Sequence, residues 1–280
     1  MKAACLVAMA TVIVSSHAAC AEEYRYSIGV GLEFSSGKYG GAHRTNSVYA
    51  PVTLTATPTD RLGLALEIPF VYQSHGNVFS SLARGGMQSN RSMMLPAAGA
   101  NTMSGHPGGM SSSSSGRHGS EGGLGDITLK VGYLLLQETD AVPQLRATAL
   151  VKFPSADEER SLGTGEFDEG LAFEISKWFG AWNPFAEAGY VVQGRSAQLP
   201  LRNYLTYYAG LGYQLADNLR PVLLVKGATP PADGVGGVLE VRLKLRYQVT
   251  SRTGTEGYLA KGIATDSPDY GAGWSIYYDF

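Results

Sequence analysis

An apolar face and a charged face alternate along the segment from residue 239 to residue 249. The odd positions are Leu, Val, Leu, Leu, Tyr and Val, and the even positions between them are Glu, Arg, Lys, Arg and Gln. Successive side chains of a strand point to opposite faces of its sheet. A face with four charges in five positions cannot lie in a dry core, because burying unpaired charge is costly. This strand therefore separates an apolar surrounding from water or from a hydrated lumen.

The same alternation recurs along the chain in unusually long runs. Apolar or aromatic residues occupy every second position from residue 24 to residue 34. A tilted membrane strand has about 9–11 residues, whereas strands of globular proteins usually have about 5–6. Segments of this kind number twelve, an even number as in single-chain bacterial barrels. They lie at 23–34, 47–58, 61–73, 124–137, 144–153, 169–179, 184–193, 203–214, 219–228, 237–249, 256–264 and 270–280.

The connections between these segments alternate between short and long. Short turns are expected at 59–60, around 139–140, and at 180–183, 216–218 and 251–254. Longer connections are expected at 35–46, 74–123, 154–168, 194–202, 229–236 and 265–269. Short periplasmic turns and longer external loops are typical of outer-membrane barrels. The terminal aromatic residue, Phe280, resembles the C-terminal signal of such barrels.

Composition agrees with a barrel and argues against a helical membrane protein. Charged residues make up 16% of the chain, against about 25% in typical soluble domains. Glycine is abundant (36 residues), tyrosine (16) outnumbers phenylalanine (9), and the only long apolar run is N-terminal. We therefore predict an all-β fold, a transmembrane antiparallel up-and-down β-barrel of about twelve strands. A secreted β-sandwich, the alternative, would have shorter strands and a face of mostly small aliphatic residues.

The N-terminus predicts the compartment. Met1 and Lys2 precede an apolar stretch at 3–14 and small residues up to Ala21, which is the pattern of a secretory signal peptide. We predict a signal at 1–21, Sec-type export and a barrel at 22–280 in the outer membrane of a Gram-negative bacterium. A lipoprotein signal acylated at Cys20 is the alternative, and it would want an aliphatic residue where His17 stands.

Removing residues 1–21 changes the chemistry left in the chain. Both cysteines lie within residues 1–21, so the remaining chain has no disulfide framework and no thiol chemistry. The remaining chain has 21 basic and 24 acidic residues, a net charge of about −3. Such a balance gives no gross basic surface for nucleic acid. The expected partners are outer-membrane lipid and a small-molecule solute, and the sequence indicates no oligomeric state.

The connection at 74–123 has no periodicity and is rich in Ser and Gly. It carries Met87, Met93, Met94, Met103 and Met110 together with His75, His106 and His118. These are ligands that soft or borderline transition metals accept. Their spacing defines no fixed site, since there is no His-x-x-x-His and no carboxylate closely interleaved. We expect a low-complexity external loop without metal or cofactor, and metal capture is the alternative.

A family resemblance rests on three short elements. They are Gly123-Leu124-Gly125-Asp126 opening a strand, Lys152-Phe153-Pro154 with Asp157 shortly after, and Leu162-Gly163-Thr164-Gly165 with Asp168. Over roughly residues 123–280 the chain resembles the outer-membrane proteins of the meta-pathway phenol-degradation family, also labelled putative transporters. It departs from the family in Ser155-Ala156, where Thr-Gly is more usual, and in the Met/Ser-rich loop. The resemblance implies an outer-membrane barrel for entry of aromatic or other small hydrophobic compounds.

The loop at 154–168 that carries two of these elements is also acidic. It holds Asp157, Glu158 and Glu159 before the Leu-Gly-Thr-Gly element and Asp168 after it. The favoured interpretation is a solvated rim, and a constriction of the mouth is the alternative.

Residues opposite in parity to the apolar face are expected to line the pore. They are Glu33, Glu67, Asp126, Lys130, Arg146, Lys152, Glu174, Glu187, Arg220, Lys226, Glu240, Arg242, Lys244 and Arg246. Eight are basic and six acidic, and five of the basic ones (220, 226, 242, 244, 246) would form a cationic stripe on one wall. Such a stripe favours anions in a pore. In the alternative, the charges pair across strands and plug a barrel narrower than the 16–18-stranded porins.

These features favour a passive channel over an enzyme. The histidines after the signal, including His43, all fall in expected loops, and no G-x-S-x-G occurs, so no nucleophile with its base is indicated. We expect a porin-like outer-membrane transporter that passes a small solute, aromatic or anionic, without cofactor or energy coupling. A plugged structural or adhesive barrel that binds a partner through the 74–123 loop is the alternative.

Overall fold

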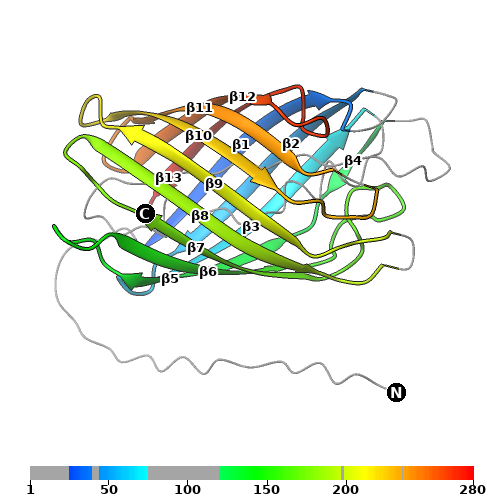
Figure 1. The fold of residues 1–280 in the computed structure, drawn as a ribbon, viewed down its shortest axis with the longest axis horizontal. Helices are drawn as coiled ribbons and strands as arrows, with labels where there is room; N and C mark the ends of the chain where they lie inside the picture. The colour runs from blue at the N-terminus through cyan, green and yellow to red at the C-terminus, as the bar shows by residue number, and fades with distance from the viewer. Residues whose placement is uncertain (1–24, 40–43, 75–119, 197–198, 235) are drawn as a thin grey trace, which may run out of the picture.

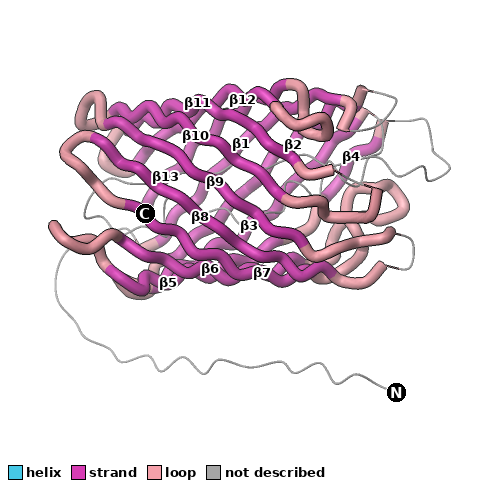
Figure 2. Tube along the Cα trace, viewed as in Figure 1, coloured by secondary structure: helices cyan, strands magenta, loops and turns pink. Residues whose placement is uncertain are grey.

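The computed structural model describes residues 25–39, 44–74, 120–196, 199–234 and 236–280. They form one antiparallel sheet that curls into a closed barrel (Figures 1 and 2). No helix of these ranges is long and apolar enough to cross a membrane. The expected signal at 1–21 and nearly all of the expected loop at 74–123 lie outside the described residues.

Twelve strands make the wall, as the sequence predicted, and one short strand is added to it. Strand β1 pairs with both β2 and β13, which closes the ring, and the added strand β4 pairs with the end of β3. The strands are β1 (Tyr26–Gly37), β2 (Thr45–Ala56), β3 (Leu62–Gln73), β4 (Glu121–Leu124), β5 (Thr128–Leu136), β6 (Gln144–Lys152), β7 (Asp168–Ser176), β8 (Trp182–Gln193), β9 (Tyr204–Tyr213), β10 (Leu219–Ala228), β11 (Val238–Gln248), β12 (Thr253–Gly262) and β13 (Tyr270–Asp279).

The strand expected at 124–137 begins only at Thr128, as β5, while β4 lies almost wholly within the loop expected at 74–123, and both pair with β3. Pro69 of β3 lies at the division and has no N–H to donate to the ladder. Its carbonyl oxygen instead accepts a hydrogen bond from Gly125 N at 2.8 Å. Phe70 pairs with Leu124 and Glu67 with Thr128, so three residues oppose two and the ladder is interrupted. Asp126 therefore lies in the connection between β4 and β5 and not on a strand.

The outer wall of the barrel is mostly apolar. Leu223, Leu243 and Leu259 are 56–66% exposed, while the residues on either side of each are buried or partly buried. Aromatic pairs lie near the strand ends that carry the short turns, with ring centroids 4.5 Å apart for Trp182–Tyr213 and 5.1 Å for Tyr278–Phe280. Aromatic girdles of this kind mark the membrane–water boundary of outer-membrane barrels.

The chain end closes the ring at the short-turn end of the barrel. Phe280 N donates to Tyr26 O at 2.9 Å, so the last residue continues the pairing of β13 with β1. The C-terminus lies at this end in Figure 1. The described parts of the longer connections lie at the opposite end, as the alternation of connection lengths predicted.

Candidate functional site

The fourteen residues expected on the inner face are buried or half-buried in the structure. Twelve are at most 7% exposed, and the other two, Glu33 and Asp126, are half-buried. Charged side chains therefore fill the interior of this barrel, while apolar ones cover its outside. Lys261, whose parity the sequence did not fix, is exposed on the outer face.

The cationic stripe on β10 and β11 is largely paired with acids. Arg242 Nη2 lies 2.8 Å from Glu240 Oε2. Glu256 of β12 holds two further cations, with its Oε1 2.7 Å from Lys244 Nζ and its Oε2 2.9 Å from Arg246 Nη2. Three of the five stripe cations are thus neutralised by contact. Arg220 instead lies with its guanidinium carbon 5.5 Å from the ring centroid of Trp178.

Two interior acids were missed from the sequence. Glu256 is 5% exposed and opposes Arg246, and Asp168, which was assigned to a loop, is 2% exposed at the start of β7. With these two, the described residues place eight basic and eight acidic side chains in the interior, and these charges balance. The short turn after residue 248 was the available signal, since a hairpin there places residues 246 and 256 opposite each other.

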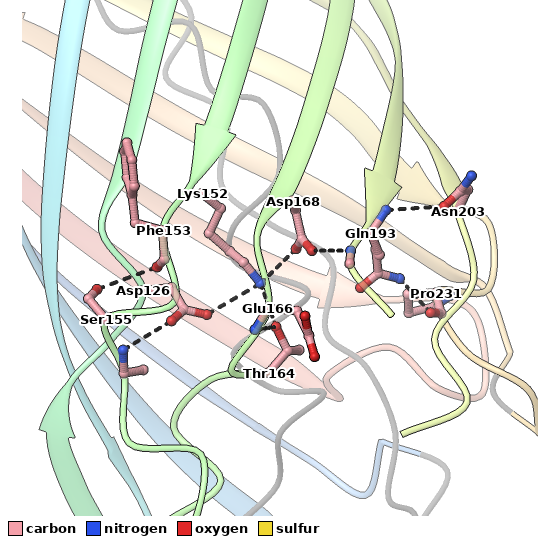
Figure 3. A network of polar contacts seen from close by, with 12 residues as sticks. Asp126, Lys152, Phe153, Ser155, Thr164, Glu166, Asp168, Gln193, Asn203 and Pro231 are labelled. Atoms are coloured by element: carbon pink, nitrogen blue, oxygen red, sulfur yellow. Dashed lines mark hydrogen bonds and ion pairs between the residues drawn. The ribbon is translucent and has the colours of Figure 1, made fainter. Parts of the chain in front are cut away.

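Lys152 joins two of the missed or displaced acids at the long-loop end of the barrel (Figure 3). Its Nζ lies 2.6 Å from Asp168 Oδ2 and 3.3 Å from Asp126 Oδ2. It also donates to Thr164 Oγ1 at 2.9 Å. Asp126 accepts from Ala156 N, and Asp168 accepts from the backbone of the β8–β9 loop. The elements that carry the family resemblance therefore meet in one polar cluster that ties three connections together.

The β6–β7 loop folds inward over this cluster. Leu162 is 1% exposed and packs against Tyr49 of β2 and Val71 of β3, both on the inner face. A Cβ atom on Gly163 would lie 2.7 Å from both carboxylate oxygens of Asp126, so glycine permits this close approach. The acids at 157–159 are exposed, as a solvated rim requires. The loop thus combines an exposed acidic rim with an apolar residue inserted into the mouth.

Three tyrosines point inward and bind acids, which parity had not indicated. Tyr258 OH donates to Glu33 Oε2 at 2.8 Å, and Tyr49 OH donates to Glu67. Tyr208 OH lies within hydrogen-bond distance of both Glu174 and Glu187. Residue type alone could not decide which tyrosines point inward, because the adjacent Tyr207 and Tyr208 lie on opposite faces, 42% and 4% exposed.

One lateral row of ionisable residues crosses six neighbouring strands, from β6 to β11. Each member faces the next in register, and every member is buried. The row, in order, is Arg146, Glu174, Glu187, Tyr208, Lys226 and Glu240. About half of the inner wall therefore carries a continuous belt of charged and phenolic groups.

The described residues offer this interior electrostatic machinery and no metal centre. Within the described ranges, no group of three or more His, Cys, Asp and Glu is placed to hold a metal ion. The four histidines after the signal, and the methionines of the 74–123 loop, lie outside those ranges. The arrangement can attract, repel and orient charged or polar solutes.

Comparison with known proteins confirms the family resemblance. The family model described as “Putative MetA-pathway of phenol degradation” matches residues 45–280. A COG4313 outer membrane channel from Pseudomonas putida F1 has a similar fold, with a TM-score of 0.64 and 15% identity over 94% of this chain and 100% of that one. No curated protein sequence matches the chain significantly.

Two porins have the same kind of barrel at lower similarity. The KdgM porin in complex with disordered oligogalacturonate has a TM-score of 0.52 and 7% identity, over 91% of this chain and 99% of that one. The NanC porin has a TM-score of 0.51 and 10% identity, over 90% and 98% of the two chains. At such low sequence identity, the structural similarity shows a shared barrel fold alone.

Proposed function

Because the chain belongs to the family described as putative MetA-pathway of phenol degradation, we propose that it is an outer-membrane channel through which a small solute diffuses. The fourteen inner residues predicted from parity, with Glu256 and Asp168, line its passage. The solute is a small aromatic or anionic compound. Passage needs no cofactor and no energy coupling, since it follows the concentration gradient.

The observation that carries the proposal is the charge inside an apolar wall. A barrel that served only as a membrane scaffold would be more stable with an apolar or small-residue interior, because buried ion pairs often stabilise a protein less than packed hydrophobic residues do. This chain instead keeps eight cations and eight anions inside the barrel. Lumen charge of this kind sets the selectivity of pores.

The compartment follows from the chain's own ends and wall. Residues 1–21 have the pattern of a Sec-type signal, and their removal leaves the barrel at 22–280. The apolar outer face and its aromatic pairs fit a lipid bilayer. We place the mature chain in the outer membrane of a Gram-negative cell, with the short turns at the periplasmic side and the longer loops outside.

A closed barrel is the second candidate, and the packing of the interior favours it. Fourteen of the sixteen inner charged residues are at most 7% exposed, and Leu162 covers part of the mouth. In this candidate the barrel does not conduct and binds a partner through the loop at 74–123.

Liposome swelling separates the two candidates and ranks solutes. Vesicles containing folded residues 22–280 are placed in isosmotic solutions of small neutral, cationic and anionic solutes. A channel gives swelling rates above those of protein-free vesicles that differ between solutes of equal size. If the protein is folded, as its heat-modifiable gel mobility shows, and the swelling rates equal those of protein-free vesicles, the channel is contradicted and the closed barrel is supported.

A further inference from the structure

Arg146 and Lys226 are interior cations that lie outside the ion pairs described above. Arg146 is 1% exposed, and its Nε and Nη1 have no hydrogen-bond partner among the described residues. Lys226 is 7% exposed and forms no hydrogen bond or ion pair within the described part of the chain. By contrast, Lys152, Lys244 and Arg246 each lie within 3.0 Å of a carboxylate oxygen.

Both cations belong to the lateral row, and each acid beside them also contacts another residue of the interior. Glu174 and Glu187 both contact the hydroxyl of Tyr208. Glu240, which faces Lys226 in register, is held by Arg242. Nε and Nη1 of Arg146 are buried donors without an acceptor among the described residues, which costs stability unless something binds to them. Such a group marks a place for a ligand with acceptor oxygens.

We propose that Arg146 and Lys226 each bind the carboxylate of a small organic anion, one after the other, during its passage through the barrel. The inference rests on the proposed channel function and names its solute class. A planar guanidinium fits a carboxylate through two parallel hydrogen bonds, and an ammonium adds a point charge. Glu174 and Glu187 lie between the two cations in the row, so a second negative charge on the solute is repelled. The row thus favours monocarboxylates over dianions.

The ion pairs elsewhere explain why these two side chains are the ones to engage a solute. Moving Arg242 away from Glu240 removes the cation that contacts this buried carboxylate, and moving Lys244 breaks its ion pair with Glu256; breaking a buried ion pair is strongly unfavourable. Arg146 and Lys226 break no ion pair with the described residues when they turn toward a solute. They can therefore donate hydrogen bonds to a solute and attract its negative charge without breaking an ion pair.

Benzoate and benzamide test the site because they have nearly the same size and shape and differ in charge. Binding is measured by saturation-transfer NMR on residues 22–280 folded in detergent. Benzoate should bind and benzamide should bind far more weakly. Arg146→Met and Lys226→Met should each weaken benzoate binding by about tenfold, which corresponds to about 1.4 kcal/mol. Arg146→Lys keeps the charge and loses the fork, and it should fall between Arg146→Met and the unmodified chain.

The matched control is Lys244→Met. It removes one buried cation from the same interior, but one that is bound to Glu256, so benzoate binding should stay within about twofold. An equal loss in Lys244→Met would attribute binding to overall lumen charge and overturn the site. Benzoate binding left intact by both Lys226→Met and Arg146→Lys would overturn it as well. Each variant is first shown to be folded by heat-modifiable gel mobility.

The proposed anion site and the proposed channel function can be contradicted independently of each other. Benzoate binding that depends on Arg146 and Lys226, in a barrel that passes no solute, would support the site and contradict the channel. Solute flux without any preference of the chain for benzoate over benzamide would support the channel and contradict the site.

Discussion

The phenol ring of Tyr258 lies against Gly273 of the neighbouring strand, so closely that a Cβ atom at Gly273 would come within 2.2 Å of the ring. This approach directs Tyr258 into the lumen, where its hydroxyl binds Glu33 and the Arg242 guanidinium lies 4.4 Å from its ring centroid. One glycine therefore positions a tyrosine that links β12, β1 and β11. The mid-barrel network depends on this contact.

Gly273→Ala is expected to lower the free energy of unfolding by about 1–3 kcal/mol, because the added methyl overpacks the space that Tyr258 fills. The measurement is urea unfolding of the folded barrel in lipid vesicles. Gly257→Ala is the matched control, since its Cβ would meet no atom closer than 3.7 Å. Equal stability of the two variants would show that the Tyr258 contact does not constrain position 273.

Lys152→Met is expected to cost about 3–5 kcal/mol of unfolding free energy, because it leaves Asp168 buried without its counter-charge. The side chains of Lys152 and Asp168 are only 4% and 3% exposed. Arg44→Met is the control, since the Arg44–Asp269 pair is 45% and 43% exposed and should contribute less than about 1 kcal/mol. A Lys152→Met loss no larger than that of the control would contradict a structural role for the mouth cluster.

Replacing Arg242, Lys244 and Arg246 together by Gln is expected to move the reversal potential toward cation preference. The change removes three lumen cations and leaves Glu240 and Glu256 unneutralised. Bilayer recordings under a salt gradient measure the shift. Lys261→Gln, on the outer face of β12, should leave the potential unchanged. Equal reversal potentials of the triple variant and the unmodified channel would contradict the assignment of these residues to the pore.

Leu162→Ala is expected to raise single-channel conductance, because it removes the side chain that the β6–β7 loop inserts between Tyr49 and Val71. The same truncation at Leu215, which is 60% exposed, should not change conductance. Equal conductance of Leu162→Ala and Leu215→Ala would mean that the loop does not restrict the mouth.

The strands and their facing were predictable because a membrane wall forces strict alternation on the sequence. In β11 the alternation of Leu and Val with Glu, Arg and Lys determines both the strand and the side that each residue faces. The twelve-strand ring and the alternation of short and long connections followed from the same pattern. The break between β4 and β5 did not, because it arises from Pro69 on the partner strand β3.

The residues missed inside the barrel share a physical reason. Tyrosine is stable against lipid near the membrane boundary and equally stable inside when its hydroxyl finds an acid. Alternation therefore could not place Tyr208 or Tyr258. Asp168 was missed because it begins β7 directly after an acidic loop. Its burial comes from Lys152, which arrives from the preceding strand.

The charge balance of the lumen also came from pairing across strands and not from composition. Counting the expected inner residues gave an excess of two cations, which Glu256 and Asp168 cancel. An open anion-selective stripe was the sequence interpretation, yet three of its five members are held by acids. Arg146, one of the two cations proposed to bind a solute, lies outside that stripe.

Single-channel recording from residues 22–280 in a planar bilayer under a salt gradient tests the central claim most directly. A channel lined by these charges predicts discrete conductance steps with a measurable ion preference. Silence from protein whose gel mobility shows it to be folded would contradict the channel and identify the molecule as a closed barrel.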